Sequence, residues 1–250
     1  MSSYKTIRMA PIIDLKSKIL YDLPWRKSEN DYLDTEIMNI ETENIERQIA
    51  KEYMLQTGRH LFLTGKAGSG KTTLLKDIID STDKNVVVVA PTGVAAINAG
   101  GVTIHSLLTL PLTAFVPDDN YPESQFITSR TMLKRHMKYN KEKLNLLREM
   151  DTLVIDEVSM VRADMMDAID FVLRSVRRRA DPFGGVQVIM IGDLYQLPPV
   201  IKDYAWDVLK HYYRTGYFFS SHVFQRCNVL CVELTKVYRQ KDNVFLDTLN

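Results

Sequence analysis

The run from Gly65 to Thr73 combines the residue types that bind phosphate groups. Its glycines allow successive backbone N–H groups to point at one anion. Lys71 can reach the β- and γ-phosphates of a nucleoside triphosphate, and the Thr72 hydroxyl can ligate Mg²⁺. The run therefore predicts a nucleotide site. The residues expected to contact the nucleotide are Gly65, Ala67, Gly68, Ser69, Gly70, Lys71, Thr72 and Thr73.

The residues on either side of this loop support a phosphate site over a plain glycine-rich turn. Leu61–Thr64 is a short apolar run typical of a buried strand, and Leu74–Ile79 has helical apolar spacing. A strand, a glycine turn and a helix start aim both backbone N–H groups and the positive end of the helix dipole at an anion.

A second chemical pair, Asp156 and Glu157, follows the apolar run Leu153–Ile155. Ligands of open α/β sheets bind at the carboxyl ends of such strands. Asp156 is expected to hold Mg²⁺, and Glu157 to orient and deprotonate the attacking water. The pair alone is also compatible with a helix N-terminus. Together with the phosphate loop, it predicts ATP hydrolysis.

A third strand-like run, Val186–Ile191, leads into Gly192–Pro199. One interpretation is a turn closed by Pro198 and Pro199. The other makes Gln196 a sensor whose amide hydrogen-bonds the γ-phosphate or the lytic water. Both can hold, because the prolines would stiffen the loop that carries Gln196.

The elements that must position these groups alternate between strand and helix, which predicts an α/β fold with a parallel sheet covered by helices on both faces. We expect an N-terminal extension over 1–40, a motor domain over 41–230 and an irregular surface excursion over 107–130. The expected helices include Ile45–Gln56 and Val161–Val176. The expected strands are Leu61–Thr64, Val86–Ala90, Leu153–Ile155, Val186–Ile191 and Val229–Leu234.

Composition favours a soluble intracellular protein. Of 250 residues, 45% are hydrophobic, the formal net charge is +1, and no apolar run approaches the length of a membrane span. Cys227 and Cys231 are expected to be buried thiols. The basic stretch from Lys134 to Arg148 is either a solvated helix face or a surface that contacts nucleic-acid phosphates.

In this order, the motifs resemble those of the petite-integration-frequency (Pif) helicases, relatives of the RecD helicases in superfamily 1. The Thr103–Ser106 and Gly192–Pro199 runs are far more specific than the phosphate loop, and the resemblance covers roughly residues 45 to 250. Besides the phosphate loop, the matching segments are Ala90–Ala96, Gly100–Ser106, Ile155–Arg162, Phe183–Gly185, Gly192–Val200 and Leu234–Gln240.

The resemblance implies a RecA-like fold and an ATP- and Mg²⁺-dependent helicase that moves 5′ to 3′ on single-stranded DNA and unwinds duplex or structured DNA. It makes Lys71, Glu157, Gln196 and Arg239 catalytic, with Arg239 as an arginine finger. It makes Gln48 the adenine-reading residue and implies roles in DNA repair, recombination and telomere maintenance. The residues matching the DNA-contacting motif are Thr92, Gly93, Asn98, Thr103 and His105.

One departure from the family pattern concerns the end of the chain. Family members continue into a second motor domain, whereas here 231–250 would be only its truncated start. The alternatives to a helicase are a DNA-dependent ATPase without unwinding and a nucleotide-gated binding module. We expect a monomer located in the bacterial nucleoid or in a nucleus, with no membrane association.

Overall fold

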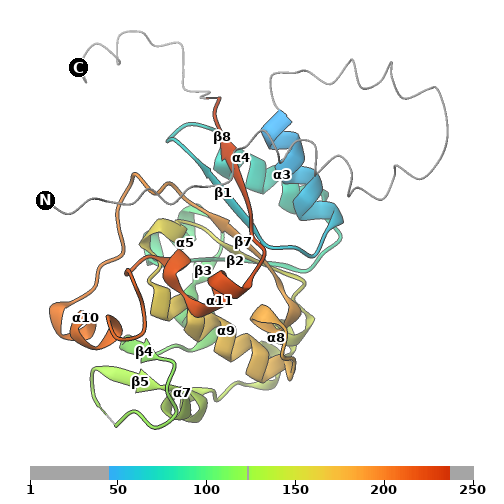
Figure 1. Cartoon of the computed structure of the whole chain (residues 1–250). Coiled ribbons are helices and arrows are strands. Elements are labelled where there is room, and N and C mark those ends of the chain that lie inside the picture. Colours follow the sequence, from blue (N-terminus) through green and yellow to red (C-terminus); the bar gives the residue numbers. More distant parts are fainter. Residues whose placement is uncertain (1–44, 123, 237–250) are drawn as a thin grey trace, which may run out of the picture. The chain divides into compact units, whose positions relative to one another are not determined.

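The computed structural model describes residues 45–122 and 124–236 (Figure 1). Its main sheet has six parallel strands in the order β3-β2-β6-β7-β1-β8. This is the predicted α/β class with a RecA-like sheet. The strands are β1 (Leu61–Gly65), β2 (Val86–Ala90), β3 (Val102–Thr103), β6 (Thr152–Ile155), β7 (Gln187–Ile191) and β8 (Leu230–Leu234).

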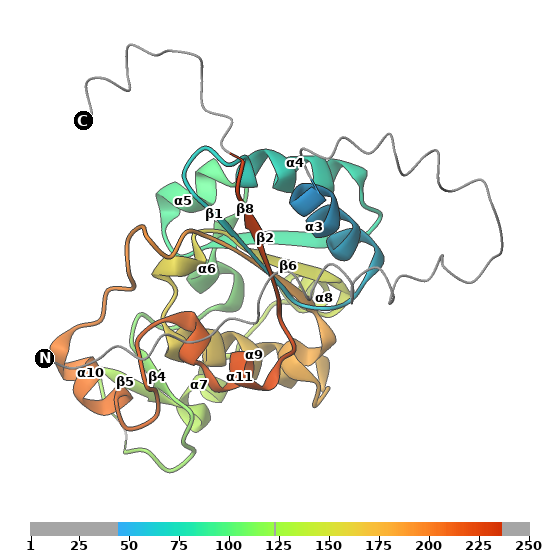
Figure 2. The same ribbon diagram turned by 45° about the horizontal axis from the view of Figure 1, so that its top comes forward.

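Helices cover both faces of this sheet, as the continuous apolar strands predict. Figure 2 shows α3 and α4 on one side and α8, α9 and α11 on the other. The helices are α3 (Ile45–Gln56), α4 (Lys71–Ser81), α5 (Gly93–Asn98), α6 (Ile104–Leu108), α7 (Arg130–His136), α8 (Lys141–Glu149), α9 (Ala163–Arg177), α10 (Asp203–Leu209) and α11 (His222–Arg226). Three short 3₁₀ turns are η3 (Val158–Met160), η4 (Pro182–Gly185) and η5 (Phe218–Ser220).

The larger core lies between the sheet and α9. Phe62, Leu153 and Met190 of three neighbouring strands pack in one cluster with Ile169 and Val172 of α9. All five side chains are nearly or completely buried. Burying a side chain of this size contributes about 1.5–3 kcal/mol, so α9 is held firmly against the strands that carry the candidate site.

Two expectations about chain organisation are wrong. The segment 107–130 is not irregular: it contains β4 (Ala114–Val116) and β5 (Ile127–Ser129), which pair in parallel and are fully buried. The domain boundary expected after residue 230 falls inside β8, whose register with β1 pairs Gly65 with Leu234. The expected extension over 1–40 lies outside the described residues, as does most of 231–250.

The remaining sequence expectations agree with the structure to within two residues at the element ends. The long helix begins at Ala163, because Val161 and Arg162 are extended.

Both cysteines are free and half-buried, and burial raises the pKa of Cys227 to about 11. No helix among the described residues is long and apolar enough to cross a membrane.

Candidate functional site

The phosphate loop leaves β1 at a glycine where any side chain would be strained. Gly65 has φ of +149°, and an added Cβ would lie 2.6 Å from the Leu234 carbonyl oxygen of β8 and 2.7 Å from Ser69 Oγ. The neighbouring strand therefore limits the space for the loop. Gly68 and Gly70 also have positive φ, at 82° and 85°, so the chain reverses tightly before α4 begins.

Helix α4 begins without a side-chain cap. Its N-cap is Gly70, and the loop is closed by a hydrogen bond from Ser69 N to Lys66 O of 3.1 Å. The Ser69 hydroxyl is buried and has no hydrogen-bond partner among the described residues. Uncapped helix N–H groups and an unpaired polar atom inside a tight loop suit an anion, since they lack other partners.

Lys71 lies over the loop that it follows. Its Nζ donates to Gly65 O at 2.5 Å and to Lys66 O at 3.2 Å. Desolvation lowers the pKa of Lys71, while the carboxylates of Asp193, Glu157 and Asp156 oppose that shift. The structure thus brings the lysine and both predicted acids together, and it adds a third acid, Asp193.

Asp156 and Glu157 follow β6 at the same edge of the sheet. Asp156 N donates to Val89 O at 2.8 Å, and Asp156 Oδ1 accepts from Glu157 N at 2.9 Å. Glu157 has φ of +51°, a conformation that costs a non-glycine residue about 1–3 kcal/mol. Burial raises the pKa of both carboxyl groups, and the positive charge of Lys71 partly offsets that rise in each.

Asp193 is the residue that the sequence analysis did not assign. It follows β7, which is the strand next to β6, and is almost fully buried. Its carboxylate accepts from Tyr195 N at 3.0 Å and from Gln196 Nε2 at 3.1 Å. Asp193 therefore holds the exposed loop that carries Gln196. Its position directly after a strand and a glycine, like that of Asp156 after β6, is the signal that points to it.

The residues present fit a Mg²⁺ ion bound mainly through phosphate. Thr72 is exposed in the first turn of α4, beside the Lys71 position. The described part of the chain has no group of three His, Cys, Asp or Glu side chains that would form a protein-only metal site. Magnesium sites of nucleotide enzymes use one or two protein ligands together with substrate phosphates and water, so Thr72 and Asp156 suffice.

The predicted DNA-contacting residues lie around two short helices. The hydroxyls of Thr92 and Thr103 cap α5 and α6 by accepting from Ala95 N at 3.2 Å and Ser106 N at 3.1 Å. Their backbone groups are thereby fixed, whereas Gly93 and Asn98 are exposed. His105 is half-buried, and desolvation followed by the charge of Arg162 lowers its pKa. His105 is therefore suited to act as a neutral hydrogen-bonding group.

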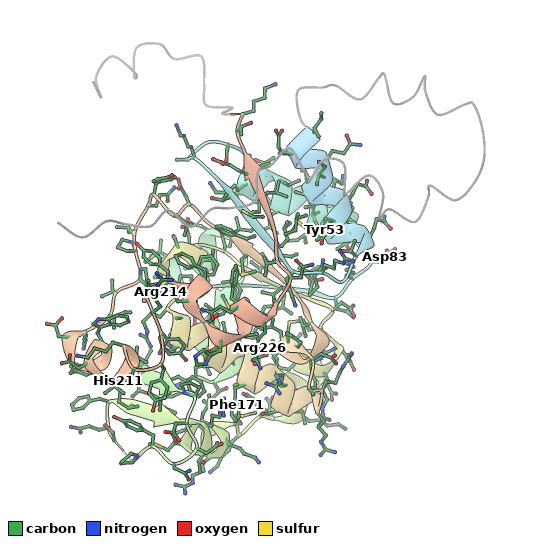
Figure 3. All side chains as sticks on the ribbon, in the orientation of Figure 1. Tyr53, Asp83, Phe171, His211, Arg214 and Arg226 are labelled. Carbon is green, nitrogen blue, oxygen red and sulfur yellow. The ribbon has the colours of Figure 1, made fainter. Side chains whose placement is uncertain are left out.

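Of the two remaining predicted residues, the structure describes only Gln48. Gln48 is exposed on α3, a helix that an ion pair between Arg47 and Asp77 joins to α4. Lys84 Nζ also holds the end of α3 by donating to Met54 O and Thr57 O, both at 2.7 Å, and Figure 3 labels Tyr53 on this helix. Arg239 lies outside the described residues.

The basic stretch over 134–148 has two kinds of side chain. Lys143 Nζ donates to Ser106 O at 2.7 Å, and Arg148 Nε donates to Val176 O at 3.4 Å. These two cations hold α8 to the rest of the domain. Lys134, Lys138 and Lys141 are exposed or half-exposed, so contact with nucleic-acid phosphates stays a prediction for them.

Comparison with known proteins agrees with these motifs. A family model described as PIF1-like helicase matches residues 37–248. The chain is 38% identical over 205 residues to the human ATP-dependent DNA helicase PIF1, covering 82% of this chain and 28% of the relative. It is 34% identical over 203 residues to the PIF1 helicase of Saccharomyces cerevisiae, covering 79% of this chain and 21% of that protein.

Solved structures give the same result. The crystal structure of Bacteroides Pif1 bound to single-stranded DNA matches with a TM-score of 0.71 and 44% identity, over 83% of this chain and 45% of that chain. Bacteroides Pif1 in complex with ADP-AlF4 matches with a TM-score of 0.68 and 45% identity, over 82% and 45%. The chain thus spans less than half the length of these relatives. On the strength of the motifs, the fold and these matches, it belongs to the PIF1-like helicase family.

Proposed function

We propose that this chain is the first motor domain of an ATP-dependent DNA helicase that moves 5′ to 3′ along single-stranded DNA. One observation carries the proposal: Lys71 of the phosphate loop lies within electrostatic reach of Asp156, Glu157 and Asp193, which follow two neighbouring strands. A lysine above a phosphate loop, near carboxylates at the ends of parallel strands, is an arrangement suited to nucleotide hydrolysis.

Each group has a distinct task in that reaction. The loop N–H groups and Lys71 bind the phosphates, and Thr72 and Asp156 hold Mg²⁺, which neutralises phosphate charge when bound. Glu157 accepts a proton from the attacking water. Its raised pKa, caused first by desolvation and then by Asp156, makes it a stronger base than an exposed glutamate. Gln196, held by Asp193, orients the water or the γ-phosphate.

Single-stranded DNA is proposed to cross the surface formed by Thr92, Gly93, Asn98, Thr103 and His105. The support is local: the capped starts of α5 and α6 fix backbone groups that can approach phosphates regardless of base sequence. Three apolar side chains nearby, Val94, Ile97 and Val102, are exposed and offer contacts to bases or to another protein surface.

Two further residues complete the proposal. Gln48 would pair with the adenine N6 and N7 through its amide, and Arg239 would stabilise transition-state charge as an arginine finger. The proposal also includes DNA repair, recombination and telomere maintenance as settings, a nuclear or nucleoid location and a monomeric state. A similar solved structure concerns DNA unwinding at forked double-stranded DNA by two coordinating Pif1 helicases, so sedimentation of this chain with and without DNA tests the monomeric state.

The nucleotide site is tested by Lys71→Ala, with Lys76→Ala on the exposed face of the same helix as control. Loss of a charged hydrogen bond costs about 1.5–3 kcal/mol, so the affinity for a fluorescent ATP analogue should fall about 10- to 150-fold. The control should bind as the wild type does. Unchanged binding by Lys71→Ala would remove the nucleotide assignment.

Activity is tested by single-turnover ATP hydrolysis, with and without a single-stranded DNA of twelve thymidines (dT12), followed by strand displacement on tailed duplexes of both polarities. The proposal expects hydrolysis that DNA stimulates. Hydrolysis without strand displacement would indicate a DNA-dependent ATPase, and nucleotide binding without turnover would indicate a nucleotide-gated binding module.

A further inference from the structure

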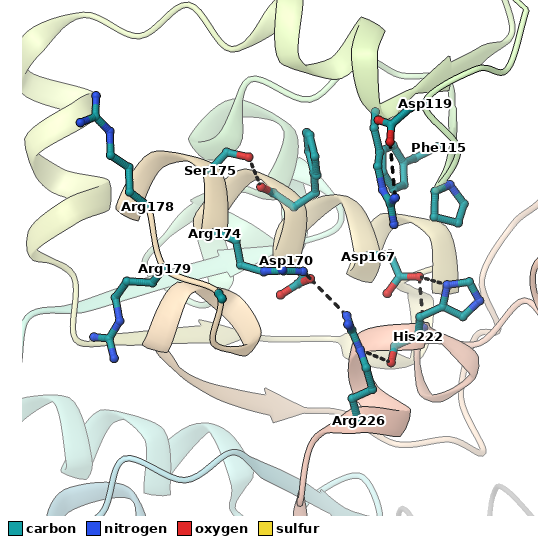
Figure 4. A pocket seen from close by; sticks show the side chains of 14 residues that line it. Phe115, Asp119, Asp167, Asp170, Arg174, Ser175, Arg178, Arg179, His222 and Arg226 are labelled. Atoms are coloured by element: carbon teal, nitrogen blue, oxygen red, sulfur yellow. Dashed lines mark hydrogen bonds and ion pairs between the residues drawn. The ribbon is translucent and has the colours of Figure 1, made fainter.

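A cavity of about 630 Å³ opens beside α9, remote in sequence from the phosphate loop (Figure 4). None of the residues expected to bind nucleotide or DNA lines it. Its lining is dominated by arginines from four parts of the chain: the start of α7, the end of α9, the turn after α9 and the end of α11. These arginines are Arg130, Arg174, Arg178, Arg179 and Arg226.

The three acids in the lining already have partners in the protein, and the exposed one, Asp119, pairs with Arg130 at 3.8 Å. Asp167 accepts backbone N–H groups of His222 at 3.1 Å and Val223 at 2.9 Å. Asp170 accepts Phe183 N at 2.7 Å and pairs with Arg174 at 3.4 Å. These carboxylates therefore anchor backbone at the base of the cavity, and they do not cancel all of its positive charge.

Several cationic donors remain available after that pairing. Among the described residues, the Arg178 side chain has no ion pair or hydrogen bond, and Arg179 pairs only with Asp181, which is exposed and does not line the cavity. Arg174 Nε is buried and has no acceptor in the described part of the chain. Figure 4 shows Arg178 and Arg179 extending outward at one end of the cavity, away from Asp170. Buried donors without acceptors and unpaired guanidinium groups favour an anion with several oxygens.

An aromatic side chain in the lining indicates which class of anion the cavity would bind. Phe171 of α9 lines the cavity, is partly exposed, and lies 6.1 Å from the buried ring of Phe115, centroid to centroid. Phe171, Arg178 and Arg179 line the same cavity. A single phosphate would fill only a small part of this volume, whereas cationic groups beside an aromatic face bind consecutive nucleotides through both phosphate and base.

We propose that this arginine cavity binds a segment of single-stranded nucleic acid, with phosphates on Arg178 and Arg179 and a base against Phe171. It is a second strand site, separate from the surface formed by Thr92 and Thr103, and it rests on the proposed function only in taking DNA as the polyanion. In a protein that separates DNA strands, this site would hold one strand while the other crosses the surface formed by Thr92 and Thr103.

The first experiment measures the salt dependence of dT12 binding by fluorescence anisotropy. Each phosphate contact with single-stranded DNA contributes about 0.7 to the slope of log affinity against log salt. Arg178→Gln combined with Arg179→Gln should lower that slope by about 1.4 and weaken binding several-fold at fixed salt. The control is Arg214→Gln, an exposed arginine outside the cavity that Figure 3 labels.

The second experiment isolates base stacking. Phe171→Leu keeps an apolar side chain against Phe115 and removes the aromatic face. It should weaken dT12 about tenfold and leave an abasic twelve-mer unaffected, because an abasic strand has no base to stack. Thermal unfolding of each variant identifies any loss of fold, and Phe171→Tyr should retain dT12 affinity.

Other results would overturn the proposal. An unchanged salt slope in the double arginine variant, or equal losses for dT12 and the abasic strand in Phe171→Leu, would exclude a strand site here. Competition by polyglutamate that depends on Arg178 and Arg179 would assign the cavity to an acidic protein segment, and displacement by millimolar tripolyphosphate alone would assign it to free phosphates. If Thr103→Ala weakens dT12 while the arginine variants do not, only this site fails. If the wild type binds no dT12, the proposed function fails with it.

Discussion

Two sets of three carboxylates in the described residues differ in the hydrogen-bond donors that surround them. The edge acids, Asp156, Glu157 and Asp193, follow the strands β6 and β7. The helix acids, Asp164, Asp167 and Asp170, lie at a spacing of three on α9, and each is more than nine-tenths buried. Both sets are found in the same α/β layer structure, so their environments can be compared directly.

Each helix acid accepts a backbone N–H from a different segment. Asp164 accepts Phe115 N of β4 at 2.8 Å, Asp167 accepts Val223 N of α11 at 2.9 Å, and Asp170 accepts Phe183 N of η4 at 2.7 Å. Three segments far apart in sequence are thereby attached to one helix. Buried carboxylates with several N–H donors are structural, because the donors repay their desolvation.

Two of the three edge acids accept fewer hydrogen bonds than the helix acids, whereas Asp193 accepts two, from Tyr195 N and Gln196 Nε2. The Glu157 carboxylate has no hydrogen bond among the described residues, and Asp156 accepts only the N–H of Glu157. Burial raises the pKa of both groups. Glu157 and Asp156, which are desolvated and have few donors, are the acids suited to a reaction, whereas Asp193 and the helix acids use their hydrogen bonds to hold segments of the fold together.

The largest expected effect is on the least bonded acid. Glu157→Gln should reduce single-turnover ATP hydrolysis about 10²- to 10⁴-fold, because the amide cannot accept the proton from water. Affinity for the nucleotide should stay the same, since Glu157 does not bind phosphate. The control is Glu149→Gln at an exposed position of α8. A loss of nucleotide binding by Glu157→Gln would contradict its role as a base.

The matching change in the helix acids should affect stability. Asp164→Ala leaves the Arg162 guanidinium, bonded to Asp164 at 2.8 Å, and the Phe115 N–H without their acceptor. Breaking a buried ion pair costs about 3–5 kcal/mol in the free energy of unfolding, measured in urea. Asp207→Ala, which breaks an exposed pair with Lys210, should leave the free energy of unfolding nearly unchanged, because solvent screens the pair. Equal losses would remove the distinction between the two sets.

Gly65 tests whether the edge tolerates a side chain at all. Gly65→Ala places a Cβ against Leu234 O and Ser69 Oγ in a backbone conformation that alanine rarely adopts. We expect a loss of about 1–3 kcal/mol in the free energy of unfolding, with weakened nucleotide binding. Gly58→Ala, with nothing within 4 Å of the new methyl group, is the matched control and should be close to neutral.

The smallest expected effect is on the pH dependence of the rate of ATP hydrolysis. Desolvation, then Asp156, and also Asp193 raise the pKa of Glu157, while Lys71 lowers it. A base must be deprotonated, so hydrolysis is lost as the pH falls through this raised pKa. Asp193→Asn removes one raising charge and should move the acidic limb of the rate profile to lower pH. Gln196→Ala loses the loop contact without the charge and should lower the rate without moving that limb.

Sequence patterns predicted the strands of the sheet and the segments that follow them better than the long-range contacts of the α9 acids. Continuous apolar runs such as Val86–Ala90 identified the buried strands, because covering both sheet faces leaves no polar position. The phosphate loop is one short continuous segment of sequence, and Asp156 and Glu157 form another directly after an apolar run. Each could therefore be recognised without knowing the fold. Asp193 was missed although it follows the same rule, because the proline-closed turn after it has an ordinary explanation of its own.

Non-local features were not readable. The strand Val102–Thr103 is too short for any periodicity, and the prolines in 107–130 concealed two strands of three residues each. The arginine cavity is assembled from α7, α9 and α11, so no single window of sequence contains it. Likewise, Asp164 looks like any polar position of an amphipathic helix until its partner on β4 is known.

The place of β1 in the sheet has a consequence for the order of folding. Its two neighbours, β7 and β8, both come from the second half of the chain. A ribosome releases the glycine loop early, but the strands that flank it emerge much later, and such long-range parallel pairing is slow. The glycine loop therefore lacks its neighbouring strands until Leu234 has been synthesised. During synthesis, this half-built sheet is the state that a chaperone would meet.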